Sequence, residues 1–427
     1  MAGLAAARQL ADHGAEVLVL EGSDRVGGKL LLGEVGGLTL DLGAESILAR
    51  RPEALDLMHA VGLDDRVVNP QTIDAAIWTH GSLRPMPPTV MGIPTSTDLN
   101  GIADVTPHVV DAPDTDVSVA EFVTARLGAD VLDRLVEPLL GGVYAGHADQ
   151  LSLRATAPQI AALGPDLLAG ATQARAAATA SGPVFAGLVG GVGQFPGAVA
   201  TGIDVRLDAT VREVTRTSDG WRLSVGPTTD VESIDVDGVI VAAPAPAAAR
   251  LLAEIAPDAA FALAAIDYAS VALVTYVFDE GPDFDGSGFL VPPIDGTFIK
   301  AATVASNKWA WVAATGRTVI RASVGRAGEA TLLQSDDADI TTRALADLRT
   351  AFGGLPEPLD SRVQRWGGGL PQYTVGHLER VDTIERDVAN VRGLEVCGAA
   401  YRGVGIPAVI ASGQAAALRL LGGTLES

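Results

Sequence analysis

The feature that most constrains how this chain can fold is a short apolar run, Val17–Leu20, which ends in the acid Glu21. Four consecutive aliphatic residues are typical of a buried strand in a parallel sheet. In a dinucleotide-binding unit, an acid at the end of the second strand accepts hydrogen bonds from ribose hydroxyls. Residues 3–14 have the pattern of the preceding helix, with Gly14 as its C-cap. The sequence therefore predicts a parallel α/β cofactor domain; the competing interpretation is an ordinary α/β fragment with a surface glutamate.

A glycine pair after this strand is a second sign of a bound phosphate. Gly27 and Gly28 would let the backbone approach a phosphate closely, and Arg25 and Lys29 stand beside them. Gly3 has the place of the third glycine of the fingerprint G-x-G-x-x-G, but no strand and no first two glycines precede it. We therefore expect the chain as written to hold its cofactor poorly, with a misassigned start codon as the simplest explanation. A tight, stoichiometric cofactor complex would contradict this expectation.

Composition and charge limit the class of protein. At 427 residues, of which 48% are hydrophobic and 19% charged, the chain is globular and long enough for more than one domain. A formal charge of -22 argues against nucleic acid and anionic membrane surfaces as partners. No apolar run reaches transmembrane length, and charged residues interrupt the apolar N-terminus, which argues against a signal peptide. The single cysteine, Cys397, is typical of a core residue in a reducing compartment, so we expect a cytoplasmic protein.

Elements of the cofactor-domain type recur in three separate stretches, residues 1–75, 188–250 and 373–427. Between them lie a sheet-forming part, residues 76–90 and 251–372, and a mainly helical part, residues 91–187. The predicted fold class is therefore α/β with α+β insertions. We expect a discontinuous Rossmann-like cofactor-binding domain, a mixed-sheet substrate domain and a small helical domain.

Several local patterns make separate predictions. Ser118 and Glu121 form a capping box at the start of a helix, and Ala155–Ala180 is alanine-rich and helical. Gly190–Gly193 lacks the lysine of a phosphate loop and fits a turn that leads into a helix. Gly367–Gly369 fits a flexible turn better than a cofactor loop. The six histidines have no metal-ligand spacing, so no metal site is expected.

Seven blocks of sequence, taken together and in order, resemble one family. They are Arg25–Lys29, Asp41–Ser46, Glu137–Gly146, Tyr268–Ala272, Lys308–Trp309, Leu370–His377 and Gly398–Pro407. They resemble the FAD-dependent porphyrinogen oxidases of haem biosynthesis, in particular the coproporphyrinogen III oxidases of Gram-positive bacteria, within the monoamine-oxidase-like flavoproteins. The two-glycine block occurs in many flavoproteins, whereas E-P-L-L-G-G-V-Y-A-G and L-P-Q-Y-x-x-G-H are specific to these oxidases. Apart from the truncated N-terminus, the resemblance covers nearly the whole chain.

The resemblance implies FAD as the cofactor, molecular oxygen as the electron acceptor and a porphyrinogen tetracarboxylate as the substrate. Six electrons would leave in three two-electron steps, giving a porphyrin and hydrogen peroxide. It also implies the three-part fold, with an FAD-binding domain, a substrate-binding sheet domain and a helical domain. We expect no nucleic-acid partner and no integral membrane segment, and the resemblance leaves room for a weak contact with a membrane or with ferrochelatase.

The resemblance also assigns candidate cofactor residues, motif by motif. Glu21 would hold the adenosine ribose, the 25–29 block would follow the pyrophosphate and ribityl chain, and the backbone at Val211 would contact the adenine. Residues 43–46 would line the flavin, and the start of the last helix would meet the isoalloxazine, where a helix N-terminus stabilises negative charge. The full set is Gly3, Glu21, Arg25, Gly27, Gly28, Lys29, Gly43, Ala44, Glu45, Ser46, Val211, Gly398, Val404, Gly405 and Ile406.

The sequence says less about how the substrate is held. The propionates need cations, for which Arg50, Arg51 and Lys300 are candidates, and Tyr373 either lines the substrate cavity or packs in the core. No acid–base dyad is obvious, so no catalytic residue is assigned. Two alternatives stay open: a protoporphyrinogen oxidase, and a porphyrin-binding protein without FAD and without catalytic activity.

Overall fold

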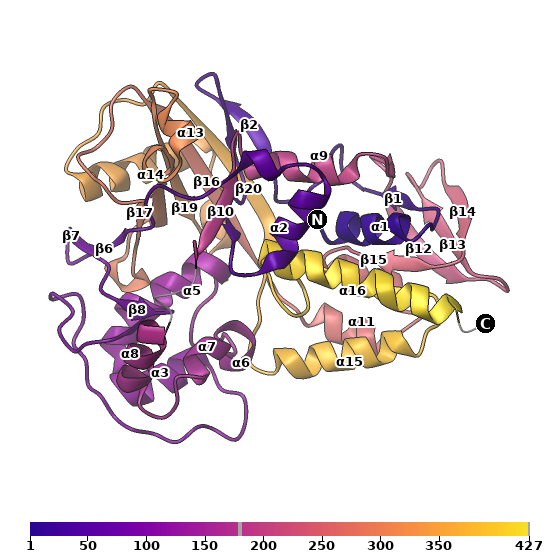
Figure 1. Ribbon diagram of the computed structural model, residues 1–427, viewed down its shortest axis with the longest axis horizontal. Coiled ribbons are helices and arrows are strands. Elements are labelled where there is room, and N and C mark those ends of the chain that lie inside the picture. Colours follow the sequence, from indigo (N-terminus) through magenta and orange to yellow (C-terminus); the bar gives the residue numbers. More distant parts are fainter. Residues whose placement is uncertain (178–181, 426–427) are drawn as a thin grey trace.

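The computed structural model describes residues 1–177 and 182–425 (Figure 1). The helices are α1 (Ala2–Asp12), α2 (Pro52–Ala60), α3 (Val119–Leu127), α4 (Ala129–Val131), α5 (Glu137–Tyr144), α6 (Leu153–Thr156), α7 (Pro158–Ala161), α8 (Leu167–Ala177), α9 (Phe195–Ala200), α10 (Ala245–Leu252), α11 (Pro257–Ala264), α12 (Ala305–Lys308), α13 (Ala310–Ala313), α14 (Asp337–Phe352), α15 (His377–Ala389) and α16 (Ile406–Leu425). Short 3-10 turns are η1 (Asp64–Arg66), η4 (Val192–Gln194), η5 (Pro293–Asp295) and η6 (Ala330–Gln334), and η2 (Leu132–Val136) is a π-helical turn.

The strands are β1 (Leu18–Leu20), β2 (Leu32–Val35), β3 (Leu38–Asp41), β4 (Ile47–Leu48), β5 (Val67–Val68), β6 (Ala75–Thr79), β7 (Ser82–Pro85), β8 (Thr89–Val90), β9 (Ile93–Pro94), β10 (Phe185–Leu188), β11 (Asp204–Arg206), β12 (Val211–Arg216), β13 (Trp221–Val225), β14 (Glu232–Val236), β15 (Val239–Val241), β16 (Tyr268–Phe278), β17 (Gly288–Leu290), β18 (Ile299–Val304), β19 (Thr318–Val324), β20 (Asp360–Pro371) and β21 (Leu394–Val396). The mixture of helices and mixed sheets confirms the predicted fold class.

The part built around α1 and α16 contains two parallel strand pairs, β1–β11 and β15–β21. The two helices pack very closely, since a Cβ at Gly413 would lie 2.2 Å from the carbonyl oxygen of Ala2. The predicted parallel strand at Val17–Leu20 is present as β1 over Leu18–Leu20, but its residues are half-buried rather than buried. Among the described residues, β1 is hydrogen-bonded along one edge only, to β11. It is therefore an edge strand, and its side chains are less covered than those of a central strand.

A seven-stranded sheet, in the order β20-β16-β19-β18-β17-β6-β7, forms a second part. Its neighbours are antiparallel except for β17 and β6. Helix α14 covers one face, where Val274, Ile320 and Ala322 share a core with Ile340 and Leu348 of the helix. The opposite face of the sheet lies against α5 and the loop of residues 41–46. Arg321 of β19 donates a hydrogen bond to Glu45 of that loop. The face of the sheet opposite α14 is therefore turned toward the predicted cofactor residues.

The helical part, at the lower left of Figure 1, consists of α3 to α8. The predicted cap is confirmed: the Oγ of Ser118 accepts a hydrogen bond from the amide of Glu121 at 3.1 Å. The alanine-rich segment Ala155–Ala180 is mainly helical within the described residues, as predicted, but it is divided among three helices, α6, α7 and α8. Pro158 and the Gly164–Pro165 pair interrupt it, because proline cannot donate a helical hydrogen bond. The end of that segment, from residue 178, lies outside the described residues.

Gly367–Gly369 lies inside β20 rather than in a flexible turn, which corrects the sequence expectation. The register between β20 and β16 shifts between Ala269 and Val271, opposite these glycines. Gly368 has φ 54°, and its amide donates a hydrogen bond to the Oγ of Ser270 at 3.0 Å. The glycines form a bulge, and a side-chain partner on the neighbouring strand fixes it.

The hydrophobic clusters bear on how the chain divides into domains. Leu252, Leu263 and Ile266 share a core with Val381 and Ile384, so the α10–α11 pair packs on the part that contains α15. The boundaries derived from the sequence, at residues 75, 90, 187, 250 and 372, stay a prediction. In the residues that the structure describes, no helix is both long enough and apolar enough to cross a membrane.

Replacing Ser118 with Ala should destabilise the helical part, because the amide of Glu121 would lose its acceptor at the start of α3. We expect the free energy of unfolding to fall by about 1 kcal/mol. Urea denaturation followed by circular dichroism measures this, with Ser118→Asp, which keeps an acceptor, as the control. Equal losses in both variants would show that the cap does not contribute.

Candidate functional site

The carboxyl ends of the two parallel strand pairs meet the N-terminus of α1. The titratable neighbours of the Met1 amino group are Cys397 after β21, Glu21 after β1, and Lys29. Burial lowers the pKa of this amino group. Helix N-termini that face the carboxyl ends of parallel strands are the places where nucleotide phosphates bind.

Glu21 keeps one carboxylate oxygen available for a ligand. Its Oε1 accepts hydrogen bonds from the amide of Ser23 at 3.0 Å and from the hydroxyl of Ser23 at 2.8 Å. Its Oε2 has no hydrogen-bond partner in the described part of the chain. The two bonds fix the carboxylate at the end of β1, where a ribose hydroxyl can donate to the remaining oxygen.

Three glycines allow close backbone approach in the same place. A Cβ at Gly3 would lie 3.1 Å from the Cβ of Ala242, which is the tight helix–strand packing expected of a third fingerprint glycine. Gly27 and Gly28 have φ 104° and 58°, and nothing lies within 4 Å of a Cβ built at Gly28. Arg25 donates a hydrogen bond to the carbonyl oxygen of Gly28 at 2.7 Å. The segment therefore fits a nucleotide cofactor in its backbone geometry.

Glu45 is the centre of a buried ion cluster. It accepts hydrogen bonds from Lys308 at 2.9 Å and from Arg321 at 2.6 Å. Lys308 also donates to the Oγ of Ser46 at 2.7 Å, and Arg321 donates to the carbonyl oxygen of Gly43. Burial alone would raise the pKa of Glu45, but the two cations outweigh it and lower the pKa to about 2. The cluster ties residues 43–46 to the substrate sheet.

The backbone of this loop is fitted closely to its surroundings. A Cβ at Gly43 would lie 1.8 Å from the carbonyl oxygen of Lys29, so only glycine fits there without moving the backbone. The amide of Ala44 donates a hydrogen bond to the same oxygen at 3.2 Å. Asp41 accepts hydrogen bonds from two amides of the Gly190–Gly193 turn at 2.9 and 2.7 Å. That turn leads into α9, which confirms its predicted role.

Three sequence blocks that are far apart in the chain meet at Tyr373. Its hydroxyl donates to the carbonyl oxygen of Ala399 at 2.7 Å and accepts from the amide of Gly403 at 2.9 Å. Gln372 donates to the carbonyl oxygen of Tyr144 at 2.8 Å, and the rings of Tyr144 and Tyr373 lie 5.7 Å apart. Tyr373 is 1% exposed. In this structure it packs in the core and holds the 399–403 loop, and contact with a substrate stays a prediction.

His377 lies beside Tyr373 and holds the same loop, and the contacts of these two side chains are together called the joint at Tyr373. Its ring stacks on Tyr373 at 3.8 Å between centroids, and its Nε2 donates to the carbonyl oxygen of Tyr401 at 2.8 Å. Its Nδ1 is buried without a partner. Burial lowers the pKa of His377 to about 4, so the imidazole is neutral at physiological pH. The histidine of the L-P-Q-Y-x-x-G-H block therefore fixes the glycine-rich loop before α16.

The remaining cofactor candidates lie around that loop and on β12. Gly398 has φ 133°, and its amide donates to a serine hydroxyl of α16. Val404 packs against the core of the helical part, and Gly405 immediately precedes α16, which Ile406 begins. Val211 is the first residue of β12 and is half-buried. Their contacts with FAD stay a prediction.

The proposed substrate cations are not brought together. Arg50 is exposed, Arg51 is paired with Glu53, and Lys300 on β18 is 4% exposed. Sequence reasoning missed the role of Arg321, although an arginine in the middle of the apolar strand Thr318–Val324 was a usable signal. It also missed Arg326, a buried cation that follows β19.

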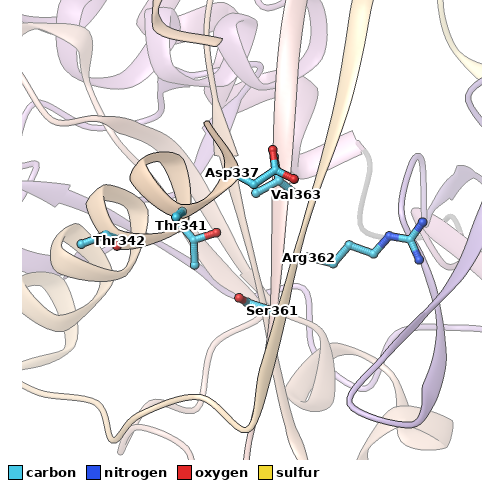
Figure 2. A pocket seen from close by; sticks show the side chains of 7 residues that line it. Asp337, Thr341, Thr342, Ser361, Arg362 and Val363 are labelled. Carbon is cyan, nitrogen blue, oxygen red and sulfur yellow. The ribbon is translucent and has the colours of Figure 1, made fainter. Parts of the chain in front are cut away.

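Two surface pockets lie apart from these residues. Figure 2 shows one between α14 and β20, where Arg362 points away from the helix. Arg362 donates to the carbonyl oxygen of Glu34 at 3.4 Å. The other pocket lies beside α9 and β11. Neither is lined by Tyr373 or Lys300, so neither is the candidate substrate site.

A nucleotide site at the ends of parallel strands, tied by ion pairs to a separate mixed sheet, defines the class of dinucleotide-dependent oxidoreductases with a substrate sheet. The family of flavin containing amine oxidoreductases matches residues 1–421, and the chain belongs to this family. Its cofactor is accordingly FAD, which fits the free Glu21 oxygen and the open backbone at Gly28.

Three similar proteins are named as porphyrinogen oxidases. The chain is 35% identical over 413 residues to coproporphyrinogen III oxidase of Mycobacterium leprae, covering 93% of this chain and 90% of that protein. It is 33% identical over 432 residues to coproporphyrinogen III oxidase of Bacillus subtilis, covering 94% and 90%. The crystal structure of a proposed protoporphyrinogen oxidase from Exiguobacterium sp. 255-15 superposes with a TM-score of 0.85 at 31% identity, covering 100% of this chain and 97% of that one.

Replacing Glu21 with Ala should weaken FAD binding by about 1–3 kcal/mol, the size of a lost hydrogen bond to a charged group. Titration of the apoprotein with FAD, followed by flavin fluorescence, measures the dissociation constant. Glu16→Ala is the matched control, since it removes the same charge from an exposed position just before β1. An unchanged dissociation constant in Glu21→Ala would make Glu21 a surface residue.

The buried His377 should make the protein sensitive to acid. Its pKa lies near 6.5 in the unfolded chain and at about 4 in the folded one, so only the unfolded state takes up a proton between these values. Stability is therefore lost as the pH falls from 6.5 to about 4. Urea midpoints measured across this range should fall more in the wild type than in His377→Gln, which retains a donor for the carbonyl of Tyr401. Parallel profiles would contradict the assignment.

Proposed function

We propose that this protein catalyses the oxygen-dependent, six-electron oxidation of coproporphyrinogen III to coproporphyrin III, with release of hydrogen peroxide, in haem biosynthesis. The observation that carries the proposal is the joint at Tyr373, where the two blocks specific to these oxidases meet the 398–407 loop. Similarity to the mycobacterial and Bacillus oxidases over more than nine-tenths of the chain supports it. The chemistry balances as three oxygen molecules reduced to three hydrogen peroxide molecules per porphyrin.

When bound, FAD supplies the two-electron acceptor for each step and passes the electrons to oxygen. In this proposal the carboxylate of Glu21 holds the ribose, and Arg25, Gly27, Gly28 and Lys29 follow the phosphates. The ion cluster around Glu45 fixes Gly43–Ser46 along the flavin. The N-terminus of α16 directs the positive end of its dipole toward residues 404–406.

The chain itself has to hold, orient and shield the macrocycle. The open face of the seven-stranded sheet, opposite α14, offers half-buried residues of small or apolar character, among them Leu273, Ala301 and Ser323. Such a wall suits a flat, largely apolar ring. Tyr373 and His377 act as positioning residues, since they hold the loop that precedes α16 and reach no solvent.

The three-domain division, oxygen as acceptor and a cytoplasmic location belong to the same proposal. A single buried cysteine is compatible with a reducing compartment. A weak contact with a membrane or with ferrochelatase is the least supported element. The alternative substrate is protoporphyrinogen, which the name of the Exiguobacterium structure favours.

The FAD-loaded protein should oxidise coproporphyrinogen III under air and release three peroxides per porphyrin. Because a chain of charge -22 has to attract a tetracarboxylate through a local cationic patch, the Michaelis constant should rise with salt. Four carboxylates should be preferred over two. Porphyrin fluorescence with coproporphyrinogen and protoporphyrinogen at several salt concentrations measures both effects.

Faster turnover of protoporphyrinogen without salt dependence would move the assignment to a protoporphyrinogen oxidase. If the FAD-loaded protein forms no porphyrin from either substrate, it is not a porphyrinogen oxidase, and only its membership of the amine oxidoreductase family remains. A chain that binds porphyrin but no FAD would be a porphyrin-binding protein without catalytic activity.

A further inference from the structure

Two buried cations lie within electrostatic reach of each other beside α5. Lys300 on β18 is 4% exposed, and Arg326, which follows β19, is 5% exposed. Over residues 1–177 and 182–425, neither side chain forms an ion pair, and the side chain of Lys300 forms no hydrogen bond. The Nε of Arg326 is buried without a partner as well. A single bond holds the guanidinium, from its NH2 group to the carbonyl oxygen of Val291 at 3.2 Å.

The protein provides little to neutralise this pair. Burial and, to a smaller extent, the charge of Arg326 lower the pKa of Lys300 to about 7. Burial also lowers the pKa of Arg326. The nearby carboxylates are Glu329 and Glu137, and Glu137 is already engaged, since it accepts a hydrogen bond from the amide of Ala148 at 2.7 Å. Like charges buried without a partner cost free energy, and such groups cluster where a ligand supplies the counter-charge.

The E-P-L-L-G-G-V-Y-A-G block puts Arg326 in place. The amide of Ala327 donates to the carbonyl oxygen of Ala145 at 2.7 Å, and the Nε2 of His147 contacts the carbonyl oxygen of Ala327 at 3.2 Å. A Cβ at Gly141 would lie 3.7 Å from the Nε of Arg326, so α5 passes close to this buried nitrogen at a residue without a side chain. The next residues of α5, Gly142 and Val143, are exposed. Solvent therefore reaches the helix immediately beside the cation pair.

We propose that Lys300 and Arg326 form a subsite that binds one carboxylate of the substrate, between α5 and β18. The inference rests on the proposed function and assigns a propionate to a place in the chain. One carboxylate oxygen can accept from the Nζ of Lys300 and the other from the Nε of Arg326, which satisfies both unpartnered donors. This subsite differs from the exposed Arg50 and the paired Arg51, because its donors have no competing acceptor.

The test uses FAD-loaded protein and the reaction product, coproporphyrin III, as the probe. Lys300→Met and Arg326→Met should each raise its dissociation constant about tenfold or more, as expected for a lost bond between charged groups. Lys300→Arg should recover most of the affinity. Arg222→Met is the matched control, since it removes one positive charge from an exposed pair with Asp235 and should leave binding unchanged.

Measuring proton uptake on binding distinguishes a Lys300 that binds the carboxylate from a Lys300 with a structural role only. At pH 8 the unliganded Lys300 is mostly neutral, and a bound carboxylate should recharge it, so calorimetry in two buffers should show uptake of about one proton per porphyrin in the wild type. The facing groups Arg326, Glu329, Glu137 and His147 stay in place in Lys300→Met, which should show none. Because that variant removes a buried amino group that has no partner, its thermal midpoint should equal or exceed that of the wild type.

Unchanged affinity and proton uptake in both methionine variants would overturn the subsite while leaving the oxidase assignment intact. A thermal midpoint of Lys300→Met below that of the wild type would make Lys300 structural and would also contradict the inference. Failure of the wild-type protein to bind coproporphyrin III or to oxidise coproporphyrinogen III would overturn the proposed function and the subsite together.

Discussion

The arrangement of the site depends on the ion cluster of Glu45, Lys308 and Arg321. Glu45 belongs to the loop that is proposed to line the flavin, whereas Lys308 lies on α12 and Arg321 on β19 of the seven-stranded sheet. Buried ion pairs contribute little net stability, because desolvation offsets their attraction, but removal of one partner costs about 3–5 kcal/mol. The cluster therefore acts mainly on geometry: residues 43–46 are held in one position relative to the sheet, so a cofactor and a substrate held by the two parts would lie at a fixed distance.

A second constraint, the joint at Tyr373, acts on the other side of the proposed flavin site. The hydroxyl of Tyr373 and the ring of His377 hold the backbone of residues 399–403. The hydroxyl both donates to this backbone and accepts from it, and the Nε2 of His377 donates to it. Neither side chain is a candidate for proton transfer, since both are buried and bonded to backbone. When the redox chemistry is carried out by the cofactor, the protein has to position the substrate and exclude water from the site. Buried contacts such as those of Tyr373 and His377 contribute to both.

Charge is distributed unevenly between the surface and the interior. The chain carries a net charge of -22, yet four of its cations, Lys300, Lys308, Arg321 and Arg326, lie buried or nearly so around the open face of the sheet. Two of them, Lys308 and Arg321, share the single carboxylate of Glu45, and the other two form no ion pair among the described residues. A cation in a low-dielectric interior acts more strongly on an anion than the screened surface charges do. Local electrostatics can therefore oppose the field of the whole molecule.

The sequence by itself determined the local chemistry. The parallel strand that ends before Glu21 and the cap at Ser118 were predicted correctly, because each depends on residues that are close in the chain, whereas the predicted burial of that strand was wrong. The strand–bulge at Gly367–Gly369 and the breaks in the alanine-rich segment were not predicted, because a neighbouring strand and single interrupting residues override composition.

Only the tertiary structure decided which distant residues act together. Lys300 was a candidate from its charge alone, but its pairing with Arg326 depends on a loop that is fixed by Ala145, 182 positions away from Ala327 along the chain. Tyr373 was equally compatible with a cavity and with the core, and its bonds to Ala399 and Gly403 placed it in the core. Pattern and propensity describe neighbours in sequence, whereas burial, ion pairing and the loss of a partner are properties of neighbours in space, which the packing of the three parts alone creates.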